Sequence, residues 1–177
     1  MRKACTMHTE TEPVVVVLDA NVFLAVLLPD ATKAGPDNVR GAERLLRSLN
    51  PGTLIAVTPA MTLAEVRWAF ARSGRGDHLQ AYYTLVTALA DRVHIMPVTA
   101  ALAYESGALR ARYYSKANDV SYIDALCLAT AFACGAAAIV STDPHLLRIA
   151  DAPVVTPSTA LEHDNIETWL GNMRRAS

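Results

Sequence analysis

The features that identify several common protein classes are missing from this sequence of 177 residues. Neither glycine-rich phosphate-binding signature, GxGxxG or GxxxxGK followed by Ser or Thr, occurs, which excludes a phosphate-loop nucleotide binder. No stretch reaches the roughly 20 uninterrupted apolar residues of a membrane span, so we expect no membrane association. The net charge is only −1, so no overall positive field attracts nucleic acid, and such a ligand would need a local basic surface.

Cysteine is also scarce, and its spacing predicts no disulfide and no zinc site. The three cysteines, Cys5, Cys127 and Cys134, show no CxxC spacing. Cys127 and Cys134 would lie about 10 Å apart along one predicted helix, which is beyond disulfide range. This pattern is typical of reduced thiols, so we expect a cytoplasmic protein.

Apolar side chains are plentiful, and their arrangement predicts an α/β fold. Hydrophobic residues make up 52% of the sequence and charged residues 19%, which is typical of a globular domain. We expect one domain over residues 13–177, after a flexible polar segment over residues 1–12. Strands alternate with helices throughout, which predicts a three-layer α/β/α sandwich with a central, mostly parallel sheet.

The expected elements follow from periodicity and from Gly and Pro breaks. Strands are predicted over residues 14–18, 53–57, 93–96, 137–140 and 154–155. Helices are predicted over residues 20–28, 38–49, 60–72, 78–90, 99–115 and 122–134, with a short helix beginning at Pro144. We expect a loop over residues 29–37 that ends in Asp37 as a helix cap, and a fraying segment after the last strand. Trp68 is expected to pack between helices and Phe132 to lie on a buried helix face.

Asp19 directly follows the first predicted strand, at the edge of the sheet where the strands end. The run Val14–Leu18 is continuously apolar and β-branched, as in a strand buried on both faces, and Asp19 follows it directly. In open α/β sheets ligands bind at the carboxyl ends of the strands, so Asp19 is a candidate for chemistry. The alternative is that Asp19 only caps the following helix.

Three further acids have the same two interpretations. Asp124 lies one turn into an almost wholly apolar helix, where an unpaired charge is costly, but Ser121 and Asp124 also fit a capping box. Asp143 follows a strand and precedes Pro144, as a helix cap would. Glu65, taken alone, is an ordinary surface residue.

The combination favours a metal site. Asp19 and Asp143 leave parallel strands at the same edge, and Glu65 and Asp124 come early in helices that begin near that edge. Four carboxylates there would repel one another unless a cation held them. Oxygen ligands without His or Cys at zinc spacing indicate Mg²⁺, for which Mn²⁺ can substitute.

The residues around these acids resemble the PIN-domain family of metal-dependent ribonucleases, which includes the VapC-type toxins of bacterial toxin–antitoxin pairs. The matching segments are LDANVF at Asp19, TLAEV at Glu65, YIDALCLATA at Asp124 and VSTDPHL at Asp143. They occur in the family's order and span residues 14 to about 155. The polar N-terminal segment and the 29–37 loop make the chain longer than the compact toxins of this family.

The resemblance implies an endoribonuclease that hydrolyses RNA phosphodiester bonds with Mg²⁺ or Mn²⁺, a cognate antitoxin and a homodimer. It implies four acidic metal ligands: Asp19, Glu65, Asp124 and Asp143. Asn21 and Ser141 would be polar neighbours that orient ligands or water. Asp119 competes with Asp124 for the third acidic role, although the pattern after Asp124 matches the family better.

Basic and aromatic residues near these acids are candidates for RNA contact, although arginines near helix ends are also commonly solvated. The basic candidates are foremost Arg67, Arg112 and Lys116, and in addition Arg72, Arg75, Arg110 and Arg148. Tyr113 and Tyr114 are candidates for stacking on unpaired bases.

Two other functions compete with the nuclease. Phosphatases with a strand-end aspartate nucleophile need a second Asp two residues later, and Asn21 occupies that position here. A non-catalytic PIN-like module that binds RNA or protein is the remaining alternative, and the presence of all four acids argues against it.

Overall fold

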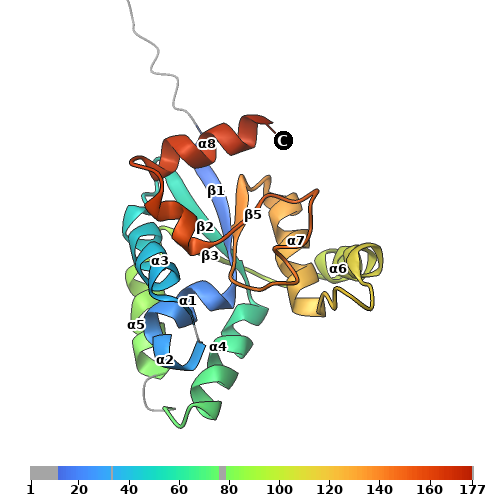
Figure 1. The fold of residues 1–177 in the computed structure, drawn as a ribbon, viewed down its shortest axis with the longest axis horizontal. Helices are drawn as coiled ribbons and strands as arrows, with labels where there is room; N and C mark the ends of the chain where they lie inside the picture. The colour runs from blue at the N-terminus through green and yellow to red at the C-terminus, as the bar shows by residue number, and fades with distance from the viewer. Residues whose placement is uncertain (1–11, 33, 76–78, 177) are drawn as a thin grey trace, which may run out of the picture.

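A computed structural model describes residues 12–32, 34–75 and 79–176, and its centre is a five-stranded parallel sheet (Figure 1). The strands are β1 (Val14–Leu18), β2 (Leu54–Pro59), β3 (Val93–Met96), β4 (Ala138–Val140) and β5 (Val154–Val155). Their order in the sheet is β3-β2-β1-β4-β5, and every pair of neighbours is parallel. The predicted strands are therefore confirmed, with β1 at the centre.

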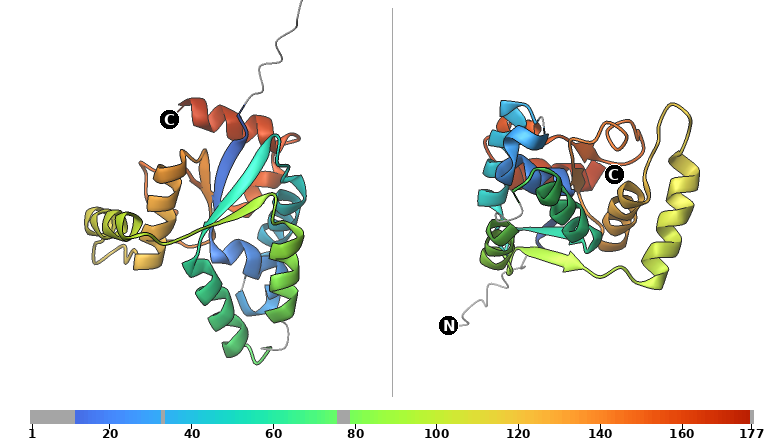
Figure 2. Two further views of the ribbon diagram at one scale, coloured as in Figure 1. Left: turned by 180° about the vertical axis from the view of Figure 1, so that it is seen from behind. Right: turned by 90° about the horizontal axis from the view of Figure 1, so that it is seen from below.

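Helices cover both faces of the sheet, which confirms the predicted three-layer architecture. The helices are α1 (Ala20–Leu27), α2 (Pro29–Thr32), α3 (Pro36–Ser48), α4 (Met61–Arg72), α5 (Leu79–Ala88), α6 (Ala100–Tyr113), α7 (Tyr122–Cys134), the 3₁₀ helix η2 (Pro157–Leu161) and α8 (Ile166–Ala176). Helix α7 packs on one face with α6 outside it, while α1, α3 and α5 lie on the other side (Figures 1 and 2). Helix α4 lies beside α1 below the carboxyl ends of the strands.

The valine run of β1 is explained by two separate cores. Alternate strand residues point to opposite faces, so Val16 and Leu18 join the core under α1 and α3, while Val17 joins the core under α7. All three side chains are fully buried. A strand enclosed on both sides needs apolar residues at every position, and this is what the sequence supplies.

Several helix boundaries differ from the predictions. Helix α3 begins at Pro36 with Gly35 as its N-cap residue, so Asp37 is not the cap but an exposed first-turn acid paired with Arg40. Part of the expected 29–37 loop forms the short helix α2. Pro144 begins a turn and not a helix, and the segment after β5 forms η2 and α8 instead of fraying.

Two aromatic residues expected in the interior lie at the surface. Trp68 is 61% exposed and Phe132 is 54% exposed. An apolar helix sequence does not reveal which of its faces meets the sheet, and the α7 positions that do so are Ala125, Cys127 and Leu128. Cys127 and Cys134 are free, as predicted.

Some expectations fall on residues outside the described ranges. These are the flexible segment over residues 1–11, Cys5, the end of the turn after α4 and the start of the helix expected from His78. Glu12, the last residue of the expected flexible segment, lies 3.5 Å from Arg174 of α8. The single domain over residues 13–177 stays a prediction. Within the described ranges, no helix combines the length and apolar character that crossing a bilayer requires.

Gly41 of α3 packs closely against η2. A Cβ atom at Gly41 would lie 2.0 Å from the Pro157 carbonyl oxygen and 2.8 Å from the Ser158 nitrogen. The Ser158 N–H also donates to Oδ1 of Asn38, at 3.1 Å. Glycine at this position is therefore required by backbone-to-backbone contact.

Gly41→Ala should destabilise the fold, because a methyl group cannot fit against a neighbouring backbone. We expect a loss of about 2 kcal/mol or more in the free energy of unfolding, measured by urea denaturation. The matched control is Gly107→Ala in α6, where a Cβ would meet nothing within 4 Å. The control should gain ~0.5–1 kcal/mol from better helix propensity. Equal stability of the two variants would contradict the packing argument.

Candidate active site

Asp19 lies where β1 meets α1 and is held by three hydrogen bonds. Its Oδ1 accepts from the Ala20 N–H at 2.7 Å, and its Oδ2 accepts from Asn21 Nδ2 at 2.9 Å and from the Ser141 hydroxyl at 2.5 Å. The side chain is buried, with 4% of its surface exposed. The structure therefore brings both predicted polar neighbours, Asn21 and Ser141, onto the same carboxylate oxygen.

Glu65 reaches the same region from α4. The buried hydroxyl of Thr58, at the end of β2, bonds both to the Leu18 carbonyl oxygen and to the Thr62 hydroxyl, each at 2.9 Å. This link fixes the first turn of α4 next to the end of β1. Oε2 of Glu65 is buried and has no hydrogen-bond partner among the described residues.

Asp124 occupies the first turn of α7 and forms the predicted capping box. Its Oδ2 accepts from the Ser121 N–H at 2.7 Å, and its own N–H donates to the Ser121 hydroxyl at 3.1 Å. The other oxygen, Oδ1, accepts no hydrogen bond from the residues that the structure describes. The cap thus uses one half of the carboxylate and leaves the other half available.

Asp143 follows β4, and backbone N–H groups likewise donate to only one of its carboxylate oxygens. Its Oδ1 accepts from the N–H groups of His145, at 2.6 Å, and Leu146, at 3.4 Å, while Oδ2 takes no bond from the described part of the chain. The Asp143 N–H donates to the Ser141 hydroxyl at 2.9 Å. Because Ser141 also donates to Asp19, one serine links the ends of two adjacent central strands.

The pKa values of Asp19, Glu65 and Asp124 are raised, first by burial and then by the charges of neighbouring acids. Burial, opposed by the Ser141 hydrogen bond, raises the pKa of Asp19 from 3.8 to about 6. Burial, followed by the charges of Asp19, Asp124 and Asp143, raises the pKa of Glu65 from 4.5 to about 8. Burial also raises the pKa of Asp124, with the charge of Asp143 adding to the rise and that of His145 opposing it. Acids perturbed by both desolvation and like charge are typical of functional sites.

The donor set suits a hard divalent cation, but its ligand geometry is not assembled. Three of the four acids keep an oxygen without a hydrogen-bond partner from the described residues, and a buried orphan oxygen such as Glu65 Oε2 needs a partner. However, within these ranges no three Asp, Glu, His or Cys side chains are placed closely enough to hold one ion. The donor types and their charges therefore suit such an ion, while the positions of the side chains do not form a three-ligand set among the described residues.

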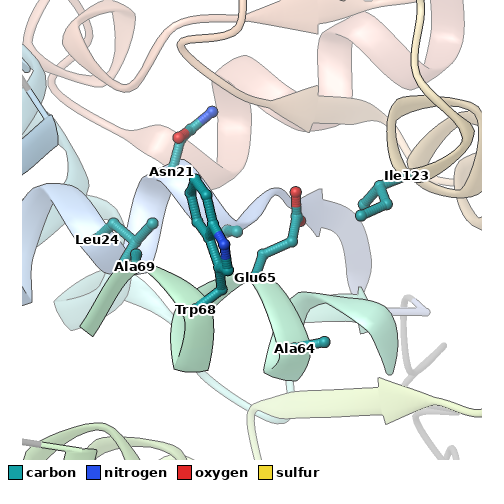
Figure 3. A pocket seen from close by; sticks show the side chains of 8 residues that line it. Asn21, Leu24, Ala64, Glu65, Trp68, Ala69 and Ile123 are labelled. Carbon is teal, nitrogen blue, oxygen red and sulfur yellow. The ribbon is translucent and has the colours of Figure 1, made fainter. Parts of the chain in front are cut away.

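A cavity of about 500 Å³ opens beside the acids between α1, α4 and α7 (Figure 3). Glu65 points into it, with Trp68 on the same helix and Ile123 across from them on α7. The remaining lining residues are Ala20, Asn21, Leu24, Ala64 and Ala69. The wall is thus mostly apolar with a few polar groups at one place, as ligand sites commonly are.

The basic residues predicted for RNA contact are exposed or have partners other than the four acids. Arg67 and Lys116 are exposed, on α4 and on the α6–α7 loop. Arg112 instead pairs with Asp151 at 2.5 Å, and Arg148 donates to the Ala117 carbonyl oxygen at 2.8 Å. Asp119, the competitor for the third acidic role, is exposed and lies 3.7 Å from Arg110. Asp124 is the acid that interacts with Glu65 and Asp143.

Two residues near the acids were missed by sequence reasoning. His145 Nδ1 lies 3.0 Å from Asn118 Oδ1, and Asn118 Nδ2 donates to the His145 carbonyl oxygen at 3.2 Å. This pair joins the turn after Asp143 to the loop before Asp124. No local pattern links two residues this far apart in the sequence, so no signal could have identified the contact.

The raised pKa values predict a pH-dependent stability in the absence of metal. Between about pH 4, where the unfolded carboxyls titrate, and the folded values of about 6 and about 8, the folded protein holds more protons than the unfolded chain. Stability must therefore fall as pH rises through this window. With EDTA present, the melting temperature should decrease from about pH 5 to about pH 8.5, and Glu65→Gln should flatten the part above about pH 6. A profile identical in wild type and variant would refute the assignment of that slope to Glu65.

Comparisons with known proteins identify the family and the fold. The sequence profile of the PIN domain matches residues 16–152, and no curated protein gives a match. Among solved structures, the chain is similar to VapC20 of Mycobacterium tuberculosis, described as a sarcin-ricin loop cleaving toxin. The TM-score is 0.60 at 18% identity, over 76% of this chain and 95% of that chain.

Two further structures show the same fold. For VapBC2 from Rickettsia felis, bound to a DNA fragment from its promoter, the TM-score is 0.57 at 18% identity, over 81% of this chain and 98% of that chain. For FitAcB from Neisseria gonorrhoeae the TM-score is 0.58 at 22% identity, over 80% and 97%. The profile match includes the whole of β1 to β4 except the first two residues of β1, and it contains all four acids. The chain belongs to the PIN domain family.

Proposed function

We propose that the chain is a metal-dependent endoribonuclease that hydrolyses RNA phosphodiester bonds and acts as a VapC-like toxin. The observation that carries the proposal is the convergence of four mutually repelling carboxylates at the carboxyl edge of the sheet. Such a group is unfavourable without a cation, and PIN domain membership and the similarity to toxin structures support the same function.

In this proposal Asp19, Glu65, Asp124 and Asp143 hold Mg²⁺ or Mn²⁺. A divalent ion bound there would lower the pKa of a coordinated water and offset the charge of the scissile phosphate. The chain's own residues prepare the site: the Ser141 and Asn21 hydrogen bonds orient Asp19, and the N–H groups after Asp143 orient that carboxylate. Glu65 keeps its proton at neutral pH until a cation replaces it, so ion affinity should rise with pH.

We propose in addition that a cognate antitoxin binds this protein. The apolar surface between α1 and α4, where Trp68 is 61% exposed beside Leu24 and Ala69, offers a site for a partner. Similar structures include a toxin-antitoxin complex from Klebsiella pneumoniae. A homodimer is also proposed, and the exposed Phe132 in the apolar groove between α6 and α7 is compatible with it.

Cleavage of a labelled single-stranded RNA with Mg²⁺ or Mn²⁺ tests the activity. EDTA should abolish cleavage, and Asp143→Asn or Asp19→Asn should slow it by roughly 100-fold or more. The control is Asp91→Asn, because Asp91 is an exposed acid just before β3. It therefore lies at the amino ends of the parallel strands, away from the carboxyl ends where the four acids lie. If RNA is cut equally by Asp143→Asn and Asp91→Asn, the acids have no part in the reaction. If no RNA is cut, the non-catalytic binding module becomes the better assignment.

Metal binding can be tested without RNA. At about 100 times its dissociation constant, Mn²⁺ should raise the melting temperature of the wild type by about 5–10 °C. Glu65→Gln and Asp143→Asn should reduce this rise, and Asp91→Asn should keep it. A rise of the same size in all four proteins would show that the ion binds elsewhere.

A further inference from the structure

Three residues at the end of α6 and the start of α7 form a cation–aromatic cluster, which we call the Arg110 stack. The Arg110 guanidinium carbon lies 4.5 Å from the ring centre of Tyr122 and 4.9 Å from that of Tyr114. Tyr122 is 62% exposed and Tyr114 is 48% exposed. Each ring therefore contacts the guanidinium while much of its surface stays open to solvent.

Tyr122 of the Arg110 stack is adjacent in the chain to residues of the candidate active site. Tyr122 is the first residue of α7, Ile123 lines the cavity beside Glu65, and Asp124 is the third acid. Tyr113, the neighbour predicted for base stacking, instead packs against the core under α7. Tyr122 was not identified from the sequence, because its position relative to the cavity depends on how α7 packs.

The segment that carries the Arg110 stack is held in place from several sides. Ser115 and Asn118 exchange backbone hydrogen bonds of 3.0 and 3.1 Å, and Asn118 bonds to His145 in the turn after Asp143. Arg148 of the same turn donates to the Ala117 carbonyl oxygen. A rigid surface loses little entropy when a ligand binds, so these contacts favour binding.

Arg110 itself is incompletely paired. Its Nε is buried and has no hydrogen-bond partner among the described residues, and its ion pair with Asp119 is long, at 3.7 Å. Lys116, in the loop that follows α6, is exposed. Cationic groups with open aromatic faces are the combination that single-stranded nucleic acids require, since bases stack on the rings while the cations meet the phosphates.

We propose that the Arg110 stack is a base-stacking subsite for single-stranded RNA, in which an unpaired base lies on the open face of Tyr122 next to the phosphate at the acids. The inference rests on the proposed ribonuclease function and names the form of its substrate. Stacking would also offset a repulsion at the site. Four carboxylates repel a phosphate backbone, whereas attraction between a base and an aromatic ring does not depend on net charge.

The test measures RNA binding separately from cleavage, in an Asp143→Asn background with Mg²⁺ present. The probe is a fluorescein-labelled single-stranded RNA of roughly 12 nucleotides, compared with the same RNA in a duplex, and the readout is fluorescence anisotropy. Tyr122→Leu should weaken single-strand binding roughly 10-fold or more, while Tyr122→Phe, which keeps the ring, should stay within about 3-fold. The matched control is Tyr104→Leu, an exposed tyrosine of α6 that should bind as its parent does.

A second readout does not depend on any substitution at Tyr122. The same RNA carrying 2-aminopurine at successive positions should show quenched fluorescence at one or two of them when bound to a protein with an intact Arg110 stack. Equal RNA binding by Tyr122→Leu and Tyr104→Leu, or no quenching at any position, would overturn the proposal and leave the Arg110 stack as a structural contact or a protein-binding surface. Absence of single-strand binding by the parent protein would overturn it too.

These outcomes separate the two proposals. Tyr122-dependent binding of an RNA that the wild type never cuts would keep the subsite and remove the nuclease. Cleavage by the wild type with no effect of Tyr122→Leu on binding would keep the nuclease and remove the subsite.

Discussion

The burial of Asp19 at the end of β1 is the constraint on which the rest of the site depends. A carboxylate with 4% of its surface exposed must be compensated, and the compensation comes from the Ala20 N–H, Asn21 and Ser141. Ser141 can reach Asp19 only because β4 lies next to β1 in the sheet. The strand order and the start of α1 therefore both serve to place hydrogen-bond donors on the buried Asp19 carboxylate. The same Ser141 hydroxyl also links Asp19 to Asp143.

The same aspartates can cap helices or turns and also offer an oxygen to a metal ion. From the sequence alone, these two roles are competing interpretations. Asp19, Asp124 and Asp143 all accept hydrogen bonds from N–H groups at helix starts or turns, as the cap interpretation requires. Those bonds occupy one oxygen of Asp124 and one of Asp143. The caps fix the positions of the remaining oxygens, so the contacts that stabilise the local fold also decide where the candidate ligands lie.

Much of the fold could be predicted because its signals are local. The valine run before Asp19, the capping box of Ser121 and Asp124, and the Gly135 helix end each act within a few residues. Apart from the cap of α3 and the short helix α2, the predictions that were wrong concern contacts between distant segments. Trp68 and Phe132 are exposed because the orientation of α4 is decided by its packing on α1, and that of α7 by its packing on the sheet, and not by their own composition. Pro144 begins only a turn, since the chain there must return to form β5.

The same limit applies to the site. Four acids could be named from their motifs, but the orphan oxygen of Glu65, the Asn118–His145 contact and the Arg110 stack all require the folded arrangement.

The Ser141–Asp19 hydrogen bond has a further consequence, because it spans 122 residues of sequence. During synthesis, β1 and β2 emerge long before α7 and β4 exist. A partly translated chain therefore has Asp19 and Glu65 without their partners from α7 and β4 until nearly the whole domain has been made.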